Sequence, residues 1–184
     1  MEITFDNYSI APVQVKDAWR VCNFVVANEG YLKDDFPETL RENSTPTLAE
    51  LFVAKKEKQF LKNEEFLFTI KENTNRSIVG LIYVKELQKK EGQGELAYCL
   101  SYQYAGKGIM TRAVQNIVNW SLNTIGLQTL QIIVHESNAA SIRIANKLNF
   151  EFITVLQKEH RRSNGKVVDM LLYELNKTQV ITST

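Results

Sequence analysis

Apolar residues recur at helical spacing in the first third of the chain, after a short opening strand. Residues 17–28 carry them three and four positions apart, which is typical of an amphipathic helix. A polar stretch with a proline at position 37 follows at residues 29–45 and predicts a loop. A second helix is expected from Pro46 to about Lys62, because proline suits the first turn of a helix.

From residue 65 onward the apolar residues form short runs that are rich in β-branched and aromatic side chains and predict strands. Two runs, residues 66–70 and 78–84, are joined by a turn-rich segment and indicate an antiparallel hairpin. A strand at 95–100, a helix at 109–124 and a strand at 130–134 follow. Such a strand–helix–strand unit predicts two parallel strands joined by a crossover.

The pattern closes with a short helix at residues 138–148 and strands at 150–156 and 167–175, on either side of an Asn-Gly pair that is typical of hairpin turns. Helices, antiparallel strands and one strand–helix–strand unit together indicate an α+β fold with a mixed, mostly antiparallel sheet. No repeat or linker divides the chain. We therefore expect one domain over residues 1–184, with a flexible tail at 176–184.

Composition is that of an ordinary globular protein. The 184 residues are 44% hydrophobic and 23% charged, which allows a sizeable core. The net charge of +1 does not favour a nucleic-acid-binding surface. The two cysteines, Cys22 and Cys99, follow no metal-ligand spacing. Because the start has no signal-like pattern and no apolar run approaches membrane-spanning length, we expect a cytoplasmic protein without nucleic-acid or membrane partners.

The most informative segment joins the strand that ends at Leu100 to the helix that begins at Ile109. It contains Gly106 and Gly108, and glycine permits positive φ and close approach of a ligand to the backbone. The start of the following helix offers free N–H groups and a positive dipole end, which attract phosphate. Neither a dinucleotide fingerprint nor a nucleoside-triphosphate loop fits, because the residues that each requires after the second glycine are absent.

A third phosphate motif does fit this segment. Gln103, Gly106 and Gly108 form a Gln-x-x-Gly-x-Gly pattern that resembles the pyrophosphate-binding loop of the GNAT superfamily of acyl-coenzyme A N-acyltransferases. Downstream, Asn138-Ala139-Ala140-Ser141 is similar to the family's Asn-x-x-Ser helix. That helix usually closes with Leu-Gly-Phe, and here Asn149 replaces the glycine. Asparagine is the next most tolerant residue at a left-handed helix end.

Further likenesses extend the resemblance to most of the chain. Residues 95–100 are similar to the family's strand before the loop. The last strand and residues 28–37 are similar to the branch that acetylates ribosomal-protein N-termini. The resemblance therefore implies a GNAT-like three-layer fold and acetyl-coenzyme A as the acetyl donor.

The resemblance also implies direct attack of an amine on the thioester. Backbone amides between the strand and the helix would hold the cofactor, and one of them, that of Leu100, would stabilise the oxyanion. The cofactor-binding residues implied in this way are Cys99, Leu100, Ser101, Gln103, Tyr104, Ala105, Gly106, Lys107, Gly108, Ile109, Met110, Asn138 and Ser141.

Two candidate catalytic residues follow from the resemblance. Glu95 matches the position of the catalytic glutamate of histone-acetylating relatives and would be the general base. Many relatives place a tyrosine seven residues after the signature asparagine, but here that position is Ala145. Ser141 is then the remaining residue of the signature that could donate a hydrogen bond or a proton to the leaving thiolate. The alternative bases near strand ends are Glu136, Glu159, His135 and His160.

The acceptor amine is less well defined by the sequence. The leading hypothesis is the α-amine of a protein or peptide N-terminus. The alternative is a small amine such as a polyamine, an aminoglycoside or an amino acid, for which a carboxylate-rich pocket is expected; Asp34, Asp35 and Glu38 are the candidate carboxylates. A third hypothesis is a non-catalytic acyl-coenzyme A-binding module, since the usual tyrosine is absent. Both a monomer and a homodimer agree with the sequence.

Overall fold

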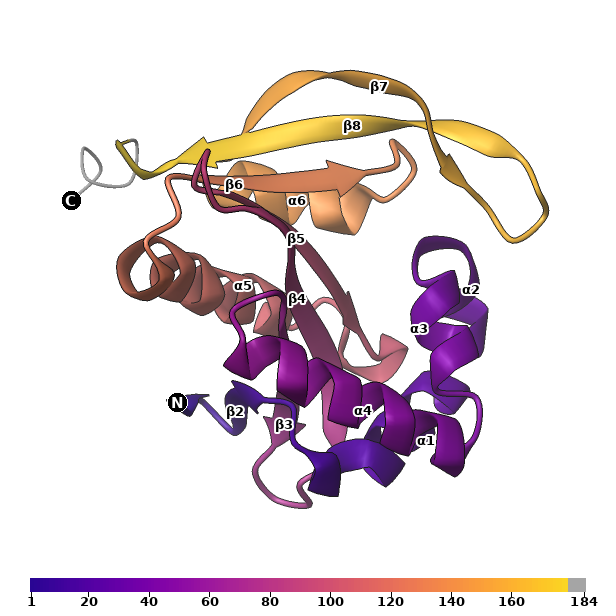
Figure 1. Cartoon of the computed structure of the whole chain (residues 1–184). Coiled ribbons are helices and arrows are strands. Elements are labelled where there is room, and N and C mark those ends of the chain that lie inside the picture. Colours follow the sequence, from indigo (N-terminus) through magenta and orange to yellow (C-terminus); the bar gives the residue numbers. More distant parts are fainter. Residues whose placement is uncertain (179–184) are drawn as a thin grey trace.

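A computed structural model of the protein describes residues 1–178 (Figure 1). Eight strands of this described part form one mixed sheet in the order β1-β2-β3-β4-β5-β6-β8-β7. Neighbouring strands are antiparallel except β5 and β6, which are parallel. The strands are β1 (Ile3–Phe5), β2 (Tyr8–Pro12), β3 (Phe66–Glu72), β4 (Ile78–Gln88), β5 (Gln93–Leu100), β6 (Thr129–Val134), β7 (Glu151–Arg161) and β8 (Val167–Asn176).

Helices cover both faces of the sheet and make a three-layer fold (Figure 1). One face packs against α1 and α4, with buried side chains such as Val21, Phe52 and Leu81 in one apolar cluster. The other face packs against α5 and α6 around a second cluster. The helices are α1 (Ala18–Ala27), α2 (Glu29–Asp35), α3 (Pro37–Glu42), α4 (Pro46–Leu61), α5 (Ile109–Trp120) and α6 (Ala139–Lys147).

The predicted local elements are present. The hairpin of β3 and β4 is antiparallel, and β5, α5 and β6 form the expected parallel crossover unit. A π-helical turn continues α5 to Ile125, and Gly126 ends it with φ of +85°. Asn149 adopts φ of +62° just after α6, which agrees with the role expected for it in place of glycine.

The loop predicted at residues 29–45 is wrong, because α2 and α3 occupy most of it. Leu32, Phe36 and Leu40 recur every four residues and pack against the cluster beneath α1 and α4. Proline at position 37 starts α3 rather than ending all helical structure, since the first helical position needs no N–H. Burial of one apolar side chain per turn therefore outweighs the polar composition.

The closing hairpin is longer than predicted, since β7 extends to Arg161 and β8 to Asn176. The predicted flexible tail begins at the last residue of β8, and its residues 179–184 lie outside the described part of the chain.

The sheet opens between its two parallel strands. β5 and β6 pair only from Gln93 to Glu95, opposite Thr129 to Gln131. Beyond this point β5 stays paired with β4 as far as Leu100, while β6 stays paired with β8 as far as Val134. The two strands therefore diverge, as Figure 1 shows, and leave a wedge-shaped opening in the middle of the sheet.

Candidate functional site

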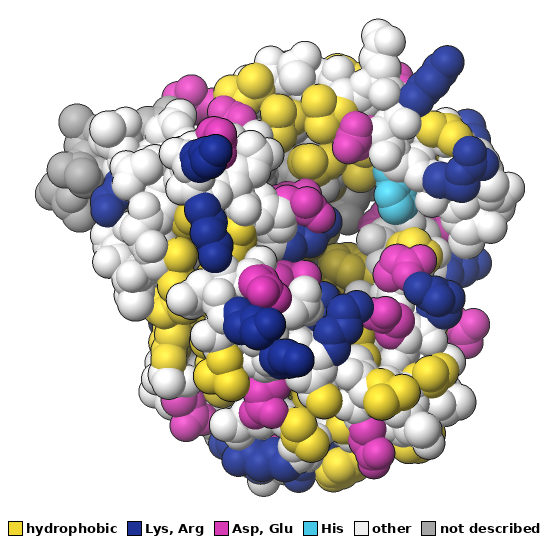
Figure 2. All heavy atoms as spheres, in the orientation of Figure 1, with side chains coloured by type: hydrophobic (Ala, Val, Ile, Leu, Met, Phe, Trp, Pro, Cys, Tyr) yellow, Lys and Arg dark blue, Asp and Glu magenta, His cyan; other side chains and the backbone are white. Residues whose placement is uncertain are grey.

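A cleft of about 450 Å³ lies at the opening between β5 and β6. Its walls come from β4, β5 and β6, from α3 and α4 on one side, and from the start of α6 and β7 on the other. Figure 2 shows a hollow on one face of the molecule, and acidic, basic and histidine side chains surround it. Of the residues predicted from the sequence, the cleft brings together Glu95, Asn138 and Ser141.

Backbone groups at the end of β5 face this opening. The amide of Ser101 donates to Val79 O of β4 over 2.7 Å. Hydrogen bonds in an antiparallel ladder alternate, so the paired residues Leu100 and Gly80 direct their N–H and C=O groups away from each other. The Leu100 amide therefore points to the side where β6 has diverged. The neighbouring Cys99 side chain packs on the opposite layer, where burial raises the pKa of its thiol to about 12.

The glycine loop has the backbone geometry of an anion site. Gly106 and Gly108 have φ of +76° and +75°, a region that favours glycine. A Cβ at either position would meet no heavy atom within 4 Å, so open space lies in front of the loop. Among the residues described, no protein acceptor receives the amides of Gly106, Lys107 or Gly108. The first-turn amides of α5 have no intrahelical partner either.

Tyr104, Lys107 and Arg112, near the loop, each contact another side chain of the protein. Gln103 and Tyr104 lie in a short 3-10 turn (Tyr102–Tyr104), and the Tyr104 hydroxyl donates to Glu72 Oε2 over 3.2 Å. The Lys107 ammonium lies 5.2 Å from the centre of the Tyr104 ring. Arg112 instead forms an exposed ion pair with Asp6. The positive groups nearest to the loop are therefore Lys107 and the helix start itself.

The Asn-x-x-Ser signature forms the first turn of α6. Asn138 Oδ1 accepts the Ser141 amide over 3.1 Å, so the asparagine side chain caps the helix. The Ser141 hydroxyl has no hydrogen-bond partner in the described part of the protein and lines the cleft. Ala145, one turn further on, is fully buried.

Glu95 lies at the floor of the cleft, opposite Lys85 of the neighbouring strand. Lys85 Nζ is 3.0 Å from Glu95 Oε1. Burial raises the pKa of the Glu95 carboxyl above its ordinary value, and the Lys85 ammonium opposes this rise; the charges of Glu86 and Glu159 add to it. The site thus holds a carboxylate whose proton affinity is set by two opposing effects.

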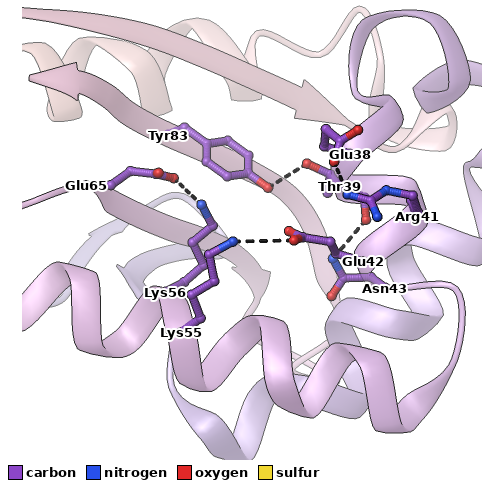
Figure 3. Close-up of polar contacts among 9 residues, drawn as sticks. All are labelled: Glu38, Thr39, Arg41, Glu42, Asn43, Lys55, Lys56, Glu65 and Tyr83. Atoms are coloured by element: carbon purple, nitrogen blue, oxygen red, sulfur yellow. Dashed lines mark hydrogen bonds and ion pairs between the residues drawn. The ribbon is translucent and has the colours of Figure 1, made fainter.

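Several further carboxylates line the cleft, and cations neutralise most of them. Figure 3 shows Lys56 reaching from α4 to Glu65, with a separation of 2.6 Å, and Lys55 reaching to Glu42. The Glu38 carboxylate pairs with Arg41, and the Tyr83 hydroxyl shares a 2.9 Å hydrogen bond with Thr39. Within the described residues, Asp35 and Glu159 are the lining carboxylates that have no ion-pair partner.

The acidic residues of α2 and α3 that the sequence suggested as a cluster point in different directions. The Asp34 carboxylate accepts from the Ser163 hydroxyl over 2.5 Å, and this hydrogen bond lowers the pKa of Asp34. Asp35 Oδ2 lies 3.5 Å from Asn138 Nδ2, and Glu38 faces Arg41. The Asp34–Ser163 contact and the hydrogen bond between His160 Nε2 and Asp34 O join α2 to the β7–β8 hairpin, whereas Asp35 faces the start of α6.

The alternative bases differ in their access to the cleft. Glu159, His135 and His160 line it, whereas Glu136 does not. His135 Nδ1 shares a 2.8 Å hydrogen bond with the Ser137 hydroxyl, and His160 bonds to α2 as described. The cleft is also lined by Tyr98, Tyr83 and Lys56, which were not predicted from the sequence. The alternation of side chains along β5 was the available signal for Tyr98.

Comparisons with known proteins agree with this geometry. A family model described as an acetyltransferase (GNAT) domain matches residues 10–151. A ribosomal-protein-S5-alanine acetyltransferase from Vibrio fischeri superposes with a TM-score of 0.88 at 20% identity, over 96% of each chain. A RimL ribosomal L7/L12 α-N-protein acetyltransferase in complex with coenzyme A superposes with a TM-score of 0.87 at 14% identity, over 96% of this chain and 98% of that one. These likenesses show a shared fold.

Sequence relatives match over shorter stretches. An uncharacterised N-acetyltransferase, p20, from Bacillus licheniformis is 23% identical over 119 residues, which are 65% of this chain and 66% of that protein. The spermidine N(1)-acetyltransferase of Escherichia coli (strain K12) is 31% identical over 71 residues, 39% of this chain and 38% of that protein. In the described residues no helix has the length and apolar character needed to cross a membrane.

Proposed function

Because the chain belongs to the GNAT acetyltransferase family, whose members use acetyl-coenzyme A, we propose that it transfers an acetyl group to the α-amine of a protein or peptide N-terminus. The observation that supports acetyl transfer is the opening between β5 and β6, together with the glycine loop that follows β5. The free amides of Gly106, Lys107 and Gly108 fit a pyrophosphate, since no protein acceptor competes for them in the described structure.

In this proposal different groups of the chain bind the cofactor and stabilise the reacting thioester. The amides from Gly106 to Met110, with Lys107 beside them, hold the pyrophosphate. The backbone from Cys99 to Ser101 lines the pantetheine arm, and Asn138 orients it at the start of α6. The Leu100 amide donates to the thioester oxygen as negative charge develops there; one such donor lowers the barrier by roughly 2.7–4 kcal/mol. When bound, the donor supplies an activated acetyl group.

Glu95 takes the proton of the attacking amine. An α-amino group has a pKa of about 8 and a lysine side chain one of about 10.4, so the α-amine is partly neutral at pH 7 and needs less help. The pairing with Lys85 limits the rise of the Glu95 pKa that burial causes, so Glu95 suits this acceptor better than a lysine. Ser141 contributes its hydroxyl at the sulfur end of the cleft.

The charges of the cleft support a singly charged acceptor. Lysine or arginine neutralises Glu38, Glu42, Glu65 and Glu95. A polyamine would need several unpaired carboxylates to replace its hydration. The names of the structurally similar ribosomal-protein acetyltransferases point in the same direction.

A small polycation is the second candidate. The unpaired carboxylates of Asp35 and Glu159 favour it, together with the partial match to a spermidine acetyltransferase. Two unpaired carboxylates in one cleft suit a short diamine better than a neutral peptide chain.

A panel of acceptors separates these functions. Coenzyme A release is measured with peptides that carry a free α-amine, with the same peptides blocked at the N-terminus but containing lysine, and with spermidine. We expect turnover with the free α-amine alone. Turnover with spermidine and not with peptides would replace the first proposal by the second. Coenzyme A binding by calorimetry without turnover on any amine would instead indicate a non-catalytic binding module.

A further inference from the structure

Tyr98 brings a phenol to the inner end of the cleft. It lies on β5 between Glu95 and Leu100, and its residue surface is only 9% exposed. The side chain lines the cleft together with Ser141. The Tyr98 hydroxyl lies 3.4 Å from the carbonyl oxygen of Ser141, in the first turn of α6. The phenol therefore meets α6 at the turn that carries the Asn-x-x-Ser signature.

This position compensates for a missing side chain. The family resemblance implies a tyrosine on the helix that corresponds to α6, at the position where this chain has Ala145. Ala145 and Tyr98 belong to the same apolar cluster, and the contact of Tyr98 with α6 is at Ser141, one turn before Ala145. A phenol thus reaches the cleft from β5 rather than from α6.

The neighbouring groups indicate what this phenol would meet. The Leu100 amide, two residues along β5, faces the same opening and is the proposed partner of the thioester oxygen. The sulfur of a thioester is bonded to the carbon that carries this oxygen. We propose that Tyr98 donates a hydrogen bond to the coenzyme A sulfur as the thiolate leaves. This inference rests on the proposed acetyltransferase function.

The Tyr98 phenol is suited to donate a hydrogen bond without losing its proton. Burial raises the pKa of the Tyr98 phenol, so it stays neutral over the working pH range. Its present bond to Ser141 O is long for an O–H donor and therefore weak, which leaves the O–H free to turn to a better acceptor. A thiolate is such an acceptor, because hydrogen bonds to charged groups are stronger than neutral ones.

The step balances without an added reagent. The C–N bond forms, the C–S bond breaks, and its electron pair goes to sulfur. The acceptor nitrogen gives one proton to Glu95, which passes it to water, and the thiolate takes one proton from water. Tyr98 keeps its own proton throughout and lowers the energy of the sulfur anion.

Tyr98→Phe tests this role and retains the ring packing. The pKa of the coenzyme A thiol in the bound complex is followed by the ultraviolet absorbance of the thiolate, and kcat is measured with the best acceptor. We expect the thiol pKa to rise by about one unit or more and kcat to fall about tenfold or more, because a hydrogen bond to a charged group is lost. The Kd of coenzyme A at neutral pH should change little, since the bound thiol is then protonated.

Tyr173→Phe is the matched control. Tyr173 is buried in the same cluster but does not line the cleft, so the thiol pKa and kcat should keep their wild-type values. Fluorotyrosines of increasing acidity at position 98 provide a second measurement: kcat should follow the phenol pKa if the phenol donates to the thiolate, and should not respond to it if Tyr98 only packs.

The outcomes separate the proposed function from the role of Tyr98. If the wild-type protein does not bind coenzyme A or does not acetylate any amine, the proposed function is wrong. If it does both, and Tyr98→Phe changes neither the thiol pKa nor kcat, the function stands and the assignment of Tyr98 is wrong.

Discussion

Individual residues in the cleft are tuned by their immediate neighbours, and Glu95 is the clearest case. Its carboxylate is mostly buried, which favours the protonated form, while Lys85 at 3.0 Å favours the ionised form. The charges of Glu86 on β4 and Glu159 on β7 also act on it. Further titratable groups line the same cleft, namely Lys56, Glu65, Tyr83, His135 and His160. Burial is the larger of the two effects, so the pKa of Glu95 stays above its ordinary value although Lys85 opposes the rise.

The first prediction concerns pH. As a base, Glu95 acts in its ionised form, so kcat/KM should fall as pH drops through its pKa, which is raised above the ordinary value. Lys85→Met removes the opposing cation and should raise that pKa further, moving the acid limb of the profile to higher pH. Lys85→Arg keeps the charge and should leave the limb nearly in place. When kcat/KM is calculated for the neutral form of the acceptor amine, a limb that stays in place in Lys85→Met, or persists in Glu95→Gln, would contradict the assignment.

The second prediction concerns the glycine loop. Gly108→Asp places a side chain on a backbone with φ of +75° and a negative charge beside the proposed pyrophosphate site, so coenzyme A binding should be lost in calorimetry. Gly126→Asp is a matched control, because φ is +85° and the space around it is also open, at the other end of the α5 segment. An unchanged coenzyme A Kd in Gly108→Asp would show that the loop does not bind the phosphate.

At the scale of elements, the cleft depends on segments that are distant in sequence. The α2 and α3 helices form one wall, and Asp34 joins α2 to the β7–β8 turn through Ser163. On the same layer, a buried ion pair between Asp17 and Lys71 joins the start of α1 to β3; its side chains are 2% and 6% exposed. These contacts place the helical layer on the sheet next to the cleft.

The third prediction concerns this buried pair. Asp17→Ala leaves the Lys71 ammonium without its partner in the interior and should lower the free energy of unfolding by about 3–5 kcal/mol. Glu2→Ala breaks an exposed pair with Arg76 and should change it by less than about 1 kcal/mol. Chemical denaturation with both variants measures the difference. Equal, small effects would mean that the buried pair contributes little.

The sequence predicts most elements because their signals are local. Side-chain periodicity located the strands of the β3–β4 hairpin, and the glycine and Asn-Gly signals located the turns. Residues 29–45 were predicted as a loop, because polar neighbours and a proline surround the three apolar residues that recur there at four-residue intervals. Packing against the cluster below α1 and α4 decides that segment.

For the whole molecule, the opening between β5 and β6 is the central feature. β5 and β6 are paired over only three residues each. Beyond them β5 stays paired with β4 and β6 with β8, so the sheet is open between β5 and β6. A ligand that fills this opening would contact both halves of the sheet and both helical layers. Its binding energy should therefore stabilise the whole fold.

The fourth prediction follows from this linkage. At a coenzyme A concentration of about 100 times Kd, the folded state gains about 2.7 kcal/mol. For a chain of this size the corresponding rise in Tm is roughly 5–11 °C. Differential scanning fluorimetry with and without coenzyme A measures it. The Gly108→Asp variant should show no such rise, and a rise of wild-type size in that variant would place the ligand elsewhere.

The sequence by itself determined the order of the elements beyond residue 65, because side-chain periodicity depends on neighbouring residues. It also determined the Gln-x-x-Gly-x-Gly and Asn-x-x-Ser signatures, because left-handed turns depend on local sequence. It identified Glu95, Asn138 and Ser141, which the fold brings to one cleft. Only the tertiary structure decided that Lys85 pairs with Glu95, that cations neutralise most lining carboxylates, and that Tyr98 meets α6. Those contacts depend on strand register and on how the helices pack across the sheet, which local sequence does not encode.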